Sequence, residues 1–222
     1  MPTESAIAMR MILAVASSDT RHQHRLVPFV LTVSLVLLAG CARPPEPVAP
    51  PHPPARVGEL FVYAPLEAGS VLAYETYAEN SDERGLVIWR VRRPREGLIE
   101  LDDGGHVERL EIEPNALRHA TGGYWLKAPI QVGACWPGRN GEVCVKSLDR
   151  RIEVPAGQFA NCLETEEARG DDSTGMRTTT VFCPNVGMVM LEVEAWAMGT
   201  IALERAELRS YGPAVDIHAL QE

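Results

Sequence analysis

The stretch Leu191-Glu192-Val193-Glu194-Ala195-Trp196 alternates apolar and acidic side chains over most of its length. Because successive side chains of a β-strand point to opposite faces of a sheet, this period of two predicts a strand with one buried face and one wet face. The same period appears in Leu110-Glu111-Ile112-Glu113. No stretch after Arg56 shows the long 3.6-residue apolar period of an amphipathic helix. The pattern therefore predicts an all-β fold.

Short runs rich in Val, Ile, Leu, Tyr and Trp recur on both sides of this stretch, and Gly, Pro, Asn and Asp interrupt them. Such spacing is typical of strands joined by hairpins, and Asn140-Gly141 is a favoured hairpin dipeptide. We expect a single antiparallel, strongly curved sheet, or a half-barrel or sandwich, of about 9–11 strands. The expected strands are 70–79, 85–92, 97–102, 106–112, 117–127 with a break at 122–123, 134–137, 142–154, 159–169, 176–182, 187–196 and 201–211.

The first forty residues have the composition of an export signal. Residues 1–25 are polar and contain three arginines, and Leu26–Ala39 is mainly apolar. That run is too short for a membrane-spanning helix, which needs about 20 residues, and it suits the centre of a signal peptide. The run closes with Leu38-Ala39-Gly40-Cys41, which resembles the lipobox of bacterial lipoproteins. The resemblance implies a signal-peptide helix over 1–40, cleavage before Cys41 and diacylation of its thiol.

The lipid on Cys41 would make the membrane a partner of this chain. Acyl chains such as palmitate contribute about 0.8 kcal/mol per buried methylene, so two or three of them anchor a protein effectively permanently. Ala42 follows the cysteine. By resemblance to enterobacterial sorting, the absence of aspartate there favours the outer membrane, with the domain facing the periplasm. An uncleaved anchor, or a buried helix with a chance cysteine, is the alternative.

A proline-rich linker follows the cysteine, because seven of the eleven residues Pro44–Pro54 are proline. Proline favours extended polyproline II, at about 3.1 Å per residue. Residues 41–56 would therefore hold the domain roughly 40–45 Å from the membrane, and a ligand for a proline-recognition groove is the alternative. We expect one β-rich domain over 57–212, large enough to bury its own core, and a C-terminal tail over 213–222.

Charge excludes some partners. Without residues 1–41, eighteen basic and twenty-eight acidic residues remain, a formal charge of −10. Nucleic acid and anionic lipid headgroups both require a basic surface, so neither is expected as a partner.

Four cysteines remain once Cys41 is set aside, and an oxidising periplasm would let them form two disulfides. A hairpin turn at Arg139-Asn140 places Cys135 opposite Cys144, and one at Asp172-Ser173 places Cys162 opposite Cys183. Facing residues of antiparallel strands lie within disulfide reach. The crossed pairings and a zinc site are the alternatives, although the chain has no Cys-x-x-Cys pair.

Three segments of the sequence resemble segments of uncharacterised bacterial envelope lipoproteins: Tyr63–Gly69, Val154–Cys162 and Cys183–Leu191. These match the patterns Tyr-x-Pro-Leu-x-x-Gly, Val-Pro-Ala-Gly-x-Phe and Pro-Gly-Val-Gly-x-Val, except that Asn185 stands where the family usually has glycine. The resemblance implies a curved antiparallel sheet and no particular activity. In addition, Ala64–Ser70 aligns with Ala128–Ala134 as a weak internal repeat, for which chance is the alternative.

We find no catalytic motif and therefore expect no catalytic residue, no metal and no cofactor. Gly-x-Ser-x-Gly and His-Glu-x-x-His are both missing from the sequence. Asp102–His106 is interpreted as a surface turn, and Glu164, Glu166 and Glu167 as part of a charged outer face.

The sequence thus predicts a non-enzymatic, membrane-anchored domain that binds an envelope protein or an apolar ligand. Most of the strand aromatics should lie in the core: Trp89, Tyr124, Trp125, Trp136 and Trp196. Some would line a binding concavity if the sheet curves over. The alternative function is an envelope hydrolase that acts on glycan or peptide through paired carboxylates.

Overall fold

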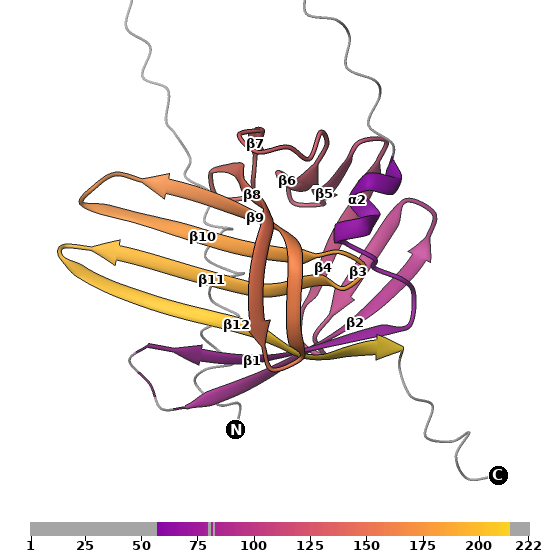
Figure 1. The fold of residues 1–222 in the computed structure, drawn as a ribbon, viewed down its shortest axis with the longest axis horizontal. Helices are drawn as coiled ribbons and strands as arrows, with labels where there is room; N and C mark the ends of the chain where they lie inside the picture. The colour runs from indigo at the N-terminus through magenta and orange to yellow at the C-terminus, as the bar shows by residue number, and fades with distance from the viewer. Residues whose placement is uncertain (1–56, 80, 82, 214–222) are drawn as a thin grey trace, which may run out of the picture.

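The computed structural model describes residues 57–79, 81 and 83–213 (Figure 1). Within these residues it contains one short helix and twelve strands. They are α2 (Val57–Tyr63), β1 (Ser70–Ala78), β2 (Arg84–Arg95), β3 (Leu98–Asp102), β4 (Val107–Glu113), β5 (Ala116–His119), β6 (Tyr124–Lys127), β7 (Cys135–Pro137), β8 (Glu142–Val154), β9 (Gly157–Gly170), β10 (Thr174–Cys183), β11 (Gly187–Ala197) and β12 (Thr200–Pro213).

All twelve strands belong to one antiparallel sheet in the order β6-β5-β4-β3-β2-β1-β12-β11-β10-β9-β8-β7. Strands that follow one another along the chain pair with each other, except β6 and β7, and the first strand also pairs with the last. The sheet is therefore an up-and-down meander that curves round until it is nearly closed, with its opening between β6 and β7. The predicted fold class is confirmed. The strand count is twelve because residues 122–123 divide one expected strand into β5 and β6.

The predicted signal peptide 1–40, the lipidated Cys41, the linker 41–56 and the tail residues 214–222 lie outside the described residues. Pro213, which was expected to begin the tail, is the last residue of β12. Among the described residues, no helix combines the length and the apolar character that crossing a membrane requires.

Helix α2 covers one end of the sheet (Figure 1). It contacts β5, β10 and β11, and its Leu60 is fully buried. This helix is not among the expected elements. Seven residues make fewer than two full turns, so the apolar period that would indicate a helix has no room to repeat.

The long hairpin β8–β9 folds back across the sheet (Figure 1). At its tip the amide of Ala156 donates to the carbonyl oxygen of Leu208 in β12 at 2.9 Å. Nearby, the rings of Phe159 and Tyr211 lie 6.4 Å apart. The pairing of β8 with β9 shifts register three times. Such bulges bend and twist a strand, which lets the hairpin reach the opposite side.

The two copies of the internal repeat end in similar turns, although only the second begins with a cis peptide bond, Ala128–Pro129. Gly69 and Gly133 both adopt left-handed backbone angles, with φ of 86° and 84°. Each turn leads into a strand, β1 or β7, and these strands lie six places apart in the meander. The matching hydrogen bonds are Gly69 N to Val91 O (2.9 Å) and Gly133 N to Val145 O (2.9 Å), then Ser70 N to Glu67 O (3.1 Å) and Ala134 N to Gln131 O (3.0 Å).

Disulfides join Cys135 to Cys144 and Cys162 to Cys183, the two pairs that the hairpin turns predict. Their strands also have the predicted registers. Asn185 stands where the resembling pattern usually has glycine, and its backbone explains why, since its φ is 61°. Asparagine tolerates this left-handed region better than most residues, so it can replace the glycine of the resembling pattern.

Candidate functional site

The opening between β6 and β7, which we call the seam, is closed by contacts outside any strand ladder. At the seam the backbones approach so closely that a Cβ on Gly123 would lie 2.2 Å from the carbonyl oxygen of Gly138. The indole Nε1 of Trp136 donates to the carbonyl oxygen of Tyr124 at 3.3 Å. These contacts hold the two edges together where strand pairing is missing.

A charged cluster crosses the same seam. Glu108 comes from β4, His119 from β5, and Arg139 from the turn between β7 and β8. One carboxylate oxygen of Glu108 lies 2.5 Å from Nη2 of Arg139 and 2.9 Å from Nδ1 of His119. Arg139 also donates to Oγ1 of Thr121 at 3.2 Å. The three side chains that form the cluster are only 12–13% exposed, so solvent screens their interaction weakly.

The environment of Glu108 keeps its carboxylate ionised. Burial raises the pKa of this group, but hydrogen bonds from His119 and Arg139 and the charge of Arg139 outweigh burial and lower the pKa to about 2. In contrast, Nε of Arg139 is buried and has no hydrogen-bond partner among the described residues.

A cavity of about 120 Å³ lies behind this cluster, on the inner side of the sheet. Glu108, His119 and Arg139 contribute to its lining. Two of its walls are aromatic and fixed by edge-to-face contacts: Trp89 packs against Tyr74 at 5.1 Å, and Trp125 against Phe182 at 5.2 Å. Its apolar surface comes mainly from Trp89, Leu101, Leu110, Trp125, Met188 and Leu191.

Glu167 corrects one sequence interpretation, because it lines this cavity and does not belong to the outer charged face. Its Oε1 accepts hydrogen bonds from the amides of Asn140 (2.5 Å) and Gly141 (2.9 Å). Side chains alternate along a strand, so Glu167 must face the side opposite to Glu166. Proximity in sequence therefore does not place these two glutamates on one face.

The outer charged face itself consists of cross-strand pairs, as the sequence interpretation expects. Glu166 lies 2.9 Å from Lys146 and 3.6 Å from Arg177, and Glu164 lies 3.2 Å from Arg150. These groups are substantially exposed, so each pair contributes little to stability.

The segment Asp102–His106 forms the expected surface turn. One carboxylate oxygen of Asp103 accepts from the amides of Gly105 at 2.9 Å and His106 at 2.7 Å. Asp103 is therefore occupied by the turn.

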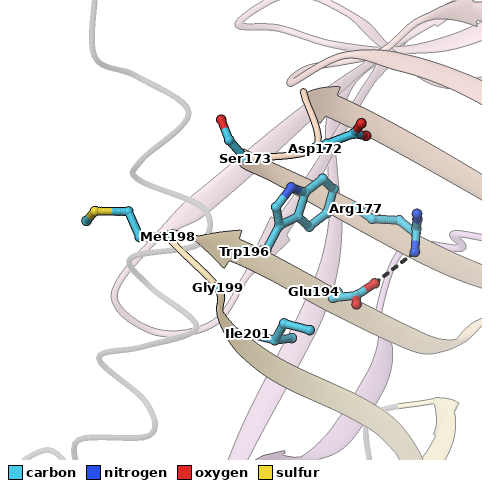
Figure 2. A pocket seen from close by; sticks show the side chains of 8 residues that line it. All are labelled: Asp172, Ser173, Arg177, Glu194, Trp196, Met198, Gly199 and Ile201. Atoms are coloured by element: carbon cyan, nitrogen blue, oxygen red, sulfur yellow. Dashed lines mark hydrogen bonds and ion pairs between the residues drawn. The ribbon is translucent and has the colours of Figure 1, made fainter.

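A second cavity, of about 510 Å³, lies on the outer side of the sheet at the tips of hairpins β9–β10 and β11–β12 (Figure 2). The inner cavity is lined by Thr178 and Val193, and their chain neighbours Arg177 and Glu194 line this outer one. The two cavities therefore lie on opposite faces of the same strands. The outer cavity is lined chiefly by Asp172, Arg177, Glu194, Trp196, Met198 and Ile201.

Cys135, Glu142 and Cys144 are close enough together to resemble a metal site, with all potential ligand atoms within 4.8 Å. The two sulfurs are joined in a disulfide. Since thiolates are the metal ligands that cysteine supplies, this group is not suited to hold an ion.

The strand aromatics divide between core and cavities. Trp136 is buried, Trp89 and Trp125 line the inner cavity, and Trp196 lines the outer one. The sequence analysis expected most of these aromatics in the core because they lie in predicted strands, and Trp196 departs from that expectation because it lies on the outer face. Sequence alternation gave no signal for the cluster across the seam, because Glu108, His119 and Arg139 come from three separate elements.

The fold and cavities define a class of protein: an all-β domain made of one nearly closed antiparallel sheet that encloses an apolar cavity. Two solved structures resemble the chain. One is provisionally described as a lipoprotein from Parabacteroides distasonis (TM-score 0.42, 12% identity, 66% of this chain and 96% of that chain covered). The other is provisionally described as an exported protein with a YmcC-like fold from Bacteroides fragilis (TM-score 0.40, 11% identity, 66% and 96% covered).

No protein-family model matches the sequence. No curated protein matches it either.

Proposed function

We propose that this chain is an envelope lipoprotein, anchored through Cys41, whose β-domain binds a small apolar group in the inner cavity. The observation that carries the proposal is an apolar cavity with Trp89 and Trp125 fixed in its walls and charged groups on one side. Its volume of about 120 Å³ is close to that of an engineered apolar cavity that binds benzene, about 150 Å³. A ligand would place an apolar end among the tryptophans and a polar end beside Glu108 and Arg139.

The carboxylates favour binding over hydrolysis. A general acid needs a pKa near the working pH, and the pKa of Glu108 is about 2. Oε1 of Glu167 already accepts two backbone amides. In this arrangement both groups orient neighbouring donors, which suits a ligand-binding site better than the proton transfer that glycoside hydrolysis requires.

The anchor has its own test. Cells fed an alkyne analogue of palmitate should incorporate it into the wild-type chain and fail to incorporate it into Cys41→Ser. Equal labelling of both forms, or labelling of neither, would exclude Cys41 as the lipidated residue.

Ligand binding is tested with benzene and indole as probes, using the unlipidated Cys41→Ser chain so that no detergent competes for the cavity. Saturating probe should raise the melting temperature, because it binds the folded state alone. Val193→Phe fills the cavity and should remove that rise, whereas Val132→Phe makes the same change at a site that is 62% exposed and should leave it intact. The proposal is wrong if neither probe raises the melting temperature, or if Val193→Phe responds like the parent chain.

A further inference from the structure

The turn between β11 and β12 carries a methionine where the backbone disfavours one. Met198 and Gly199 connect the strands, and both have positive φ, 49° and 80°. Two-residue hairpin turns of this kind favour Asn-Gly, because asparagine tolerates positive φ. Met198 is also 95% exposed, so packing within the chain offers no compensation. A residue that breaks a local rule without a folding benefit indicates a role outside the fold.

Trp196, two residues earlier, is held in a fixed orientation on the outer face. Its indole Nε1 donates to the carbonyl oxygen of Asp171 at 2.7 Å. Its ring lies over Gly175, where an added Cβ would come within 2.3 Å of it. The guanidinium of Arg177 lies 5.7 Å from the ring centroid. A side chain ordered in the free protein loses little entropy when it is contacted, which favours binding.

The tip surface, which we define as Trp196, Met198 and Ile201, borders the outer cavity on the side of hairpin β11–β12 (Figure 2). Ile201 is 54% exposed and faces Trp196 across the hairpin. Tryptophan and methionine are enriched in protein interfaces, and tryptophan is prominent among the residues that dominate binding energy. Methionine also adapts its shape to a partner. Saccharide binding would use the tryptophan ring but would leave the exposed Met198 and Ile201 without a role.

The charges around the tip surface indicate the character of the partner. Arg177 is paired with Glu194 at 2.9 Å and with Glu166 at 3.6 Å. Asp172 also lines the cavity, so the rim carries more negative than positive charge, on a domain that is acidic overall. Complementary charge speeds encounter and selects partners.

We propose that the tip surface docks another envelope protein, through a patch on that protein with an apolar centre and a basic rim. An apolar side chain at the centre of the patch enters the outer cavity between the two hairpin tips. This site lies on the face opposite to the ligand cavity and stands independently of the proposed ligand.

The test places a photoreactive benzoylphenylalanine at position 198 of the full-length lipoprotein in its native bacterium. Gln158, an exposed residue near the tip of hairpin β8–β9, is the control position. The expected result is one adduct from position 198 and none from position 158, with a crosslinked partner peptide, read by mass spectrometry, that contains apolar residues and Lys or Arg. Equal adducts at both positions, a dimer of this chain, a lipid or glycan adduct, an acidic partner peptide or no adduct would each overturn the proposal.

Two further variants, each with a matched control variant, separate docking from folding, with the photoreactive residue moved to position 201. Met198→Asn suits the turn and should keep or raise the melting temperature while it lowers the adduct yield at least tenfold, whereas Met198→Leu should retain the adduct. Asp172→Lys should lower the yield severalfold, and Asp149→Lys, an exposed site on β8, should not. An unchanged yield in Met198→Asn or Asp172→Lys would contradict the proposal even if adducts form.

Discussion

The hydroxyl of Tyr74 donates a hydrogen bond of 3.0 Å to the carbonyl oxygen of Met188, and both residues are buried. Their strands, β1 and β11, are separated in the sheet by β12, so this bond links them across the inner face. The pairing of β10 with β11 shifts register beside Met188. The side chain thus satisfies a carbonyl where the strand ladder is irregular.

Tyr74→Phe should therefore destabilise the domain, because it leaves the buried carbonyl of Met188 without its donor. The expected loss in free energy of unfolding is about 1–3 kcal/mol. Urea denaturation should show a lower midpoint with an unchanged slope. Tyr77→Phe is the control, since that hydroxyl bonds Glu207 in a half-buried position. A loss in Tyr77→Phe as large as in Tyr74→Phe would argue against the importance of burial.

Glu108→Gln should weaken the closure of the seam. Because the pKa of Glu108 is about 2 in the folded domain and 4.5 is its ordinary value, its stabilising effect is complete above about pH 4.5 and is lost as the pH falls toward 2. At pH 7 we expect the variant to lose about 1–3 kcal/mol, since the remaining Arg139 charge is only partly exposed.

The measurement is the difference in unfolding free energy between wild type and Glu108→Gln at pH 7, 5, 4 and 3. The difference should shrink as the pH falls. Glu153→Gln, on an exposed residue, should show a small difference at every pH. If the difference in unfolding free energy between wild type and Glu108→Gln stays constant down to pH 3, the folded domain does not stabilise the ionised form of Glu108 over its protonated form.

Most strands could be predicted from the sequence because alternation and turn residues are local signals. Residues 142–154 form β8 as predicted, and a turn centred on Arg139-Asn140 gives the register that pairs Cys135 with Cys144. Helix α2 was missed because it is too short to show a period. The seam was missed for a different reason: contacts such as Glu108 to Arg139 depend on how far the sheet curves, and curvature arises from bulges that alternation does not reveal.

Gly123→Ala should destabilise the seam more than Gly122→Ala. Both glycines have positive φ, 79° and 108°, so both substitutions cost backbone strain of about 1–2 kcal/mol. A Cβ at position 122 meets open space, whereas one at position 123 would contact the backbone of Gly138. The difference between the melting temperatures of the two variants measures how much the contact with Gly138 adds to the destabilisation of Gly123→Ala. Equal melting temperatures would show that the seam can widen freely.

The two disulfides should differ in their reaction with a reductant. Cys135 is exposed, whereas Cys162 and Cys183 are buried, with 0% and 1% exposure. Thiol–disulfide exchange requires access of the attacking thiolate to a sulfur. Under native conditions a mild thiol followed by alkylation should label Cys135 and Cys144 first, as peptide mass mapping would show. Labelling of all four cysteines at one rate would instead indicate that reduction follows global unfolding.

The shortness of the strands at the seam has a consequence for solubility. An unpaired strand edge can recruit a strand from another molecule and start aggregation, and proteins limit this with short or charged edges. Here the outermost strands, β6 and β7, have only four and three residues. Beyond β7 the edge continues along β8, where bulges and the exposed side chains of Lys146, Arg150 and Arg151 obstruct a regular ladder. The sheet can therefore remain open at one place without offering a template on which many copies of the protein could polymerise.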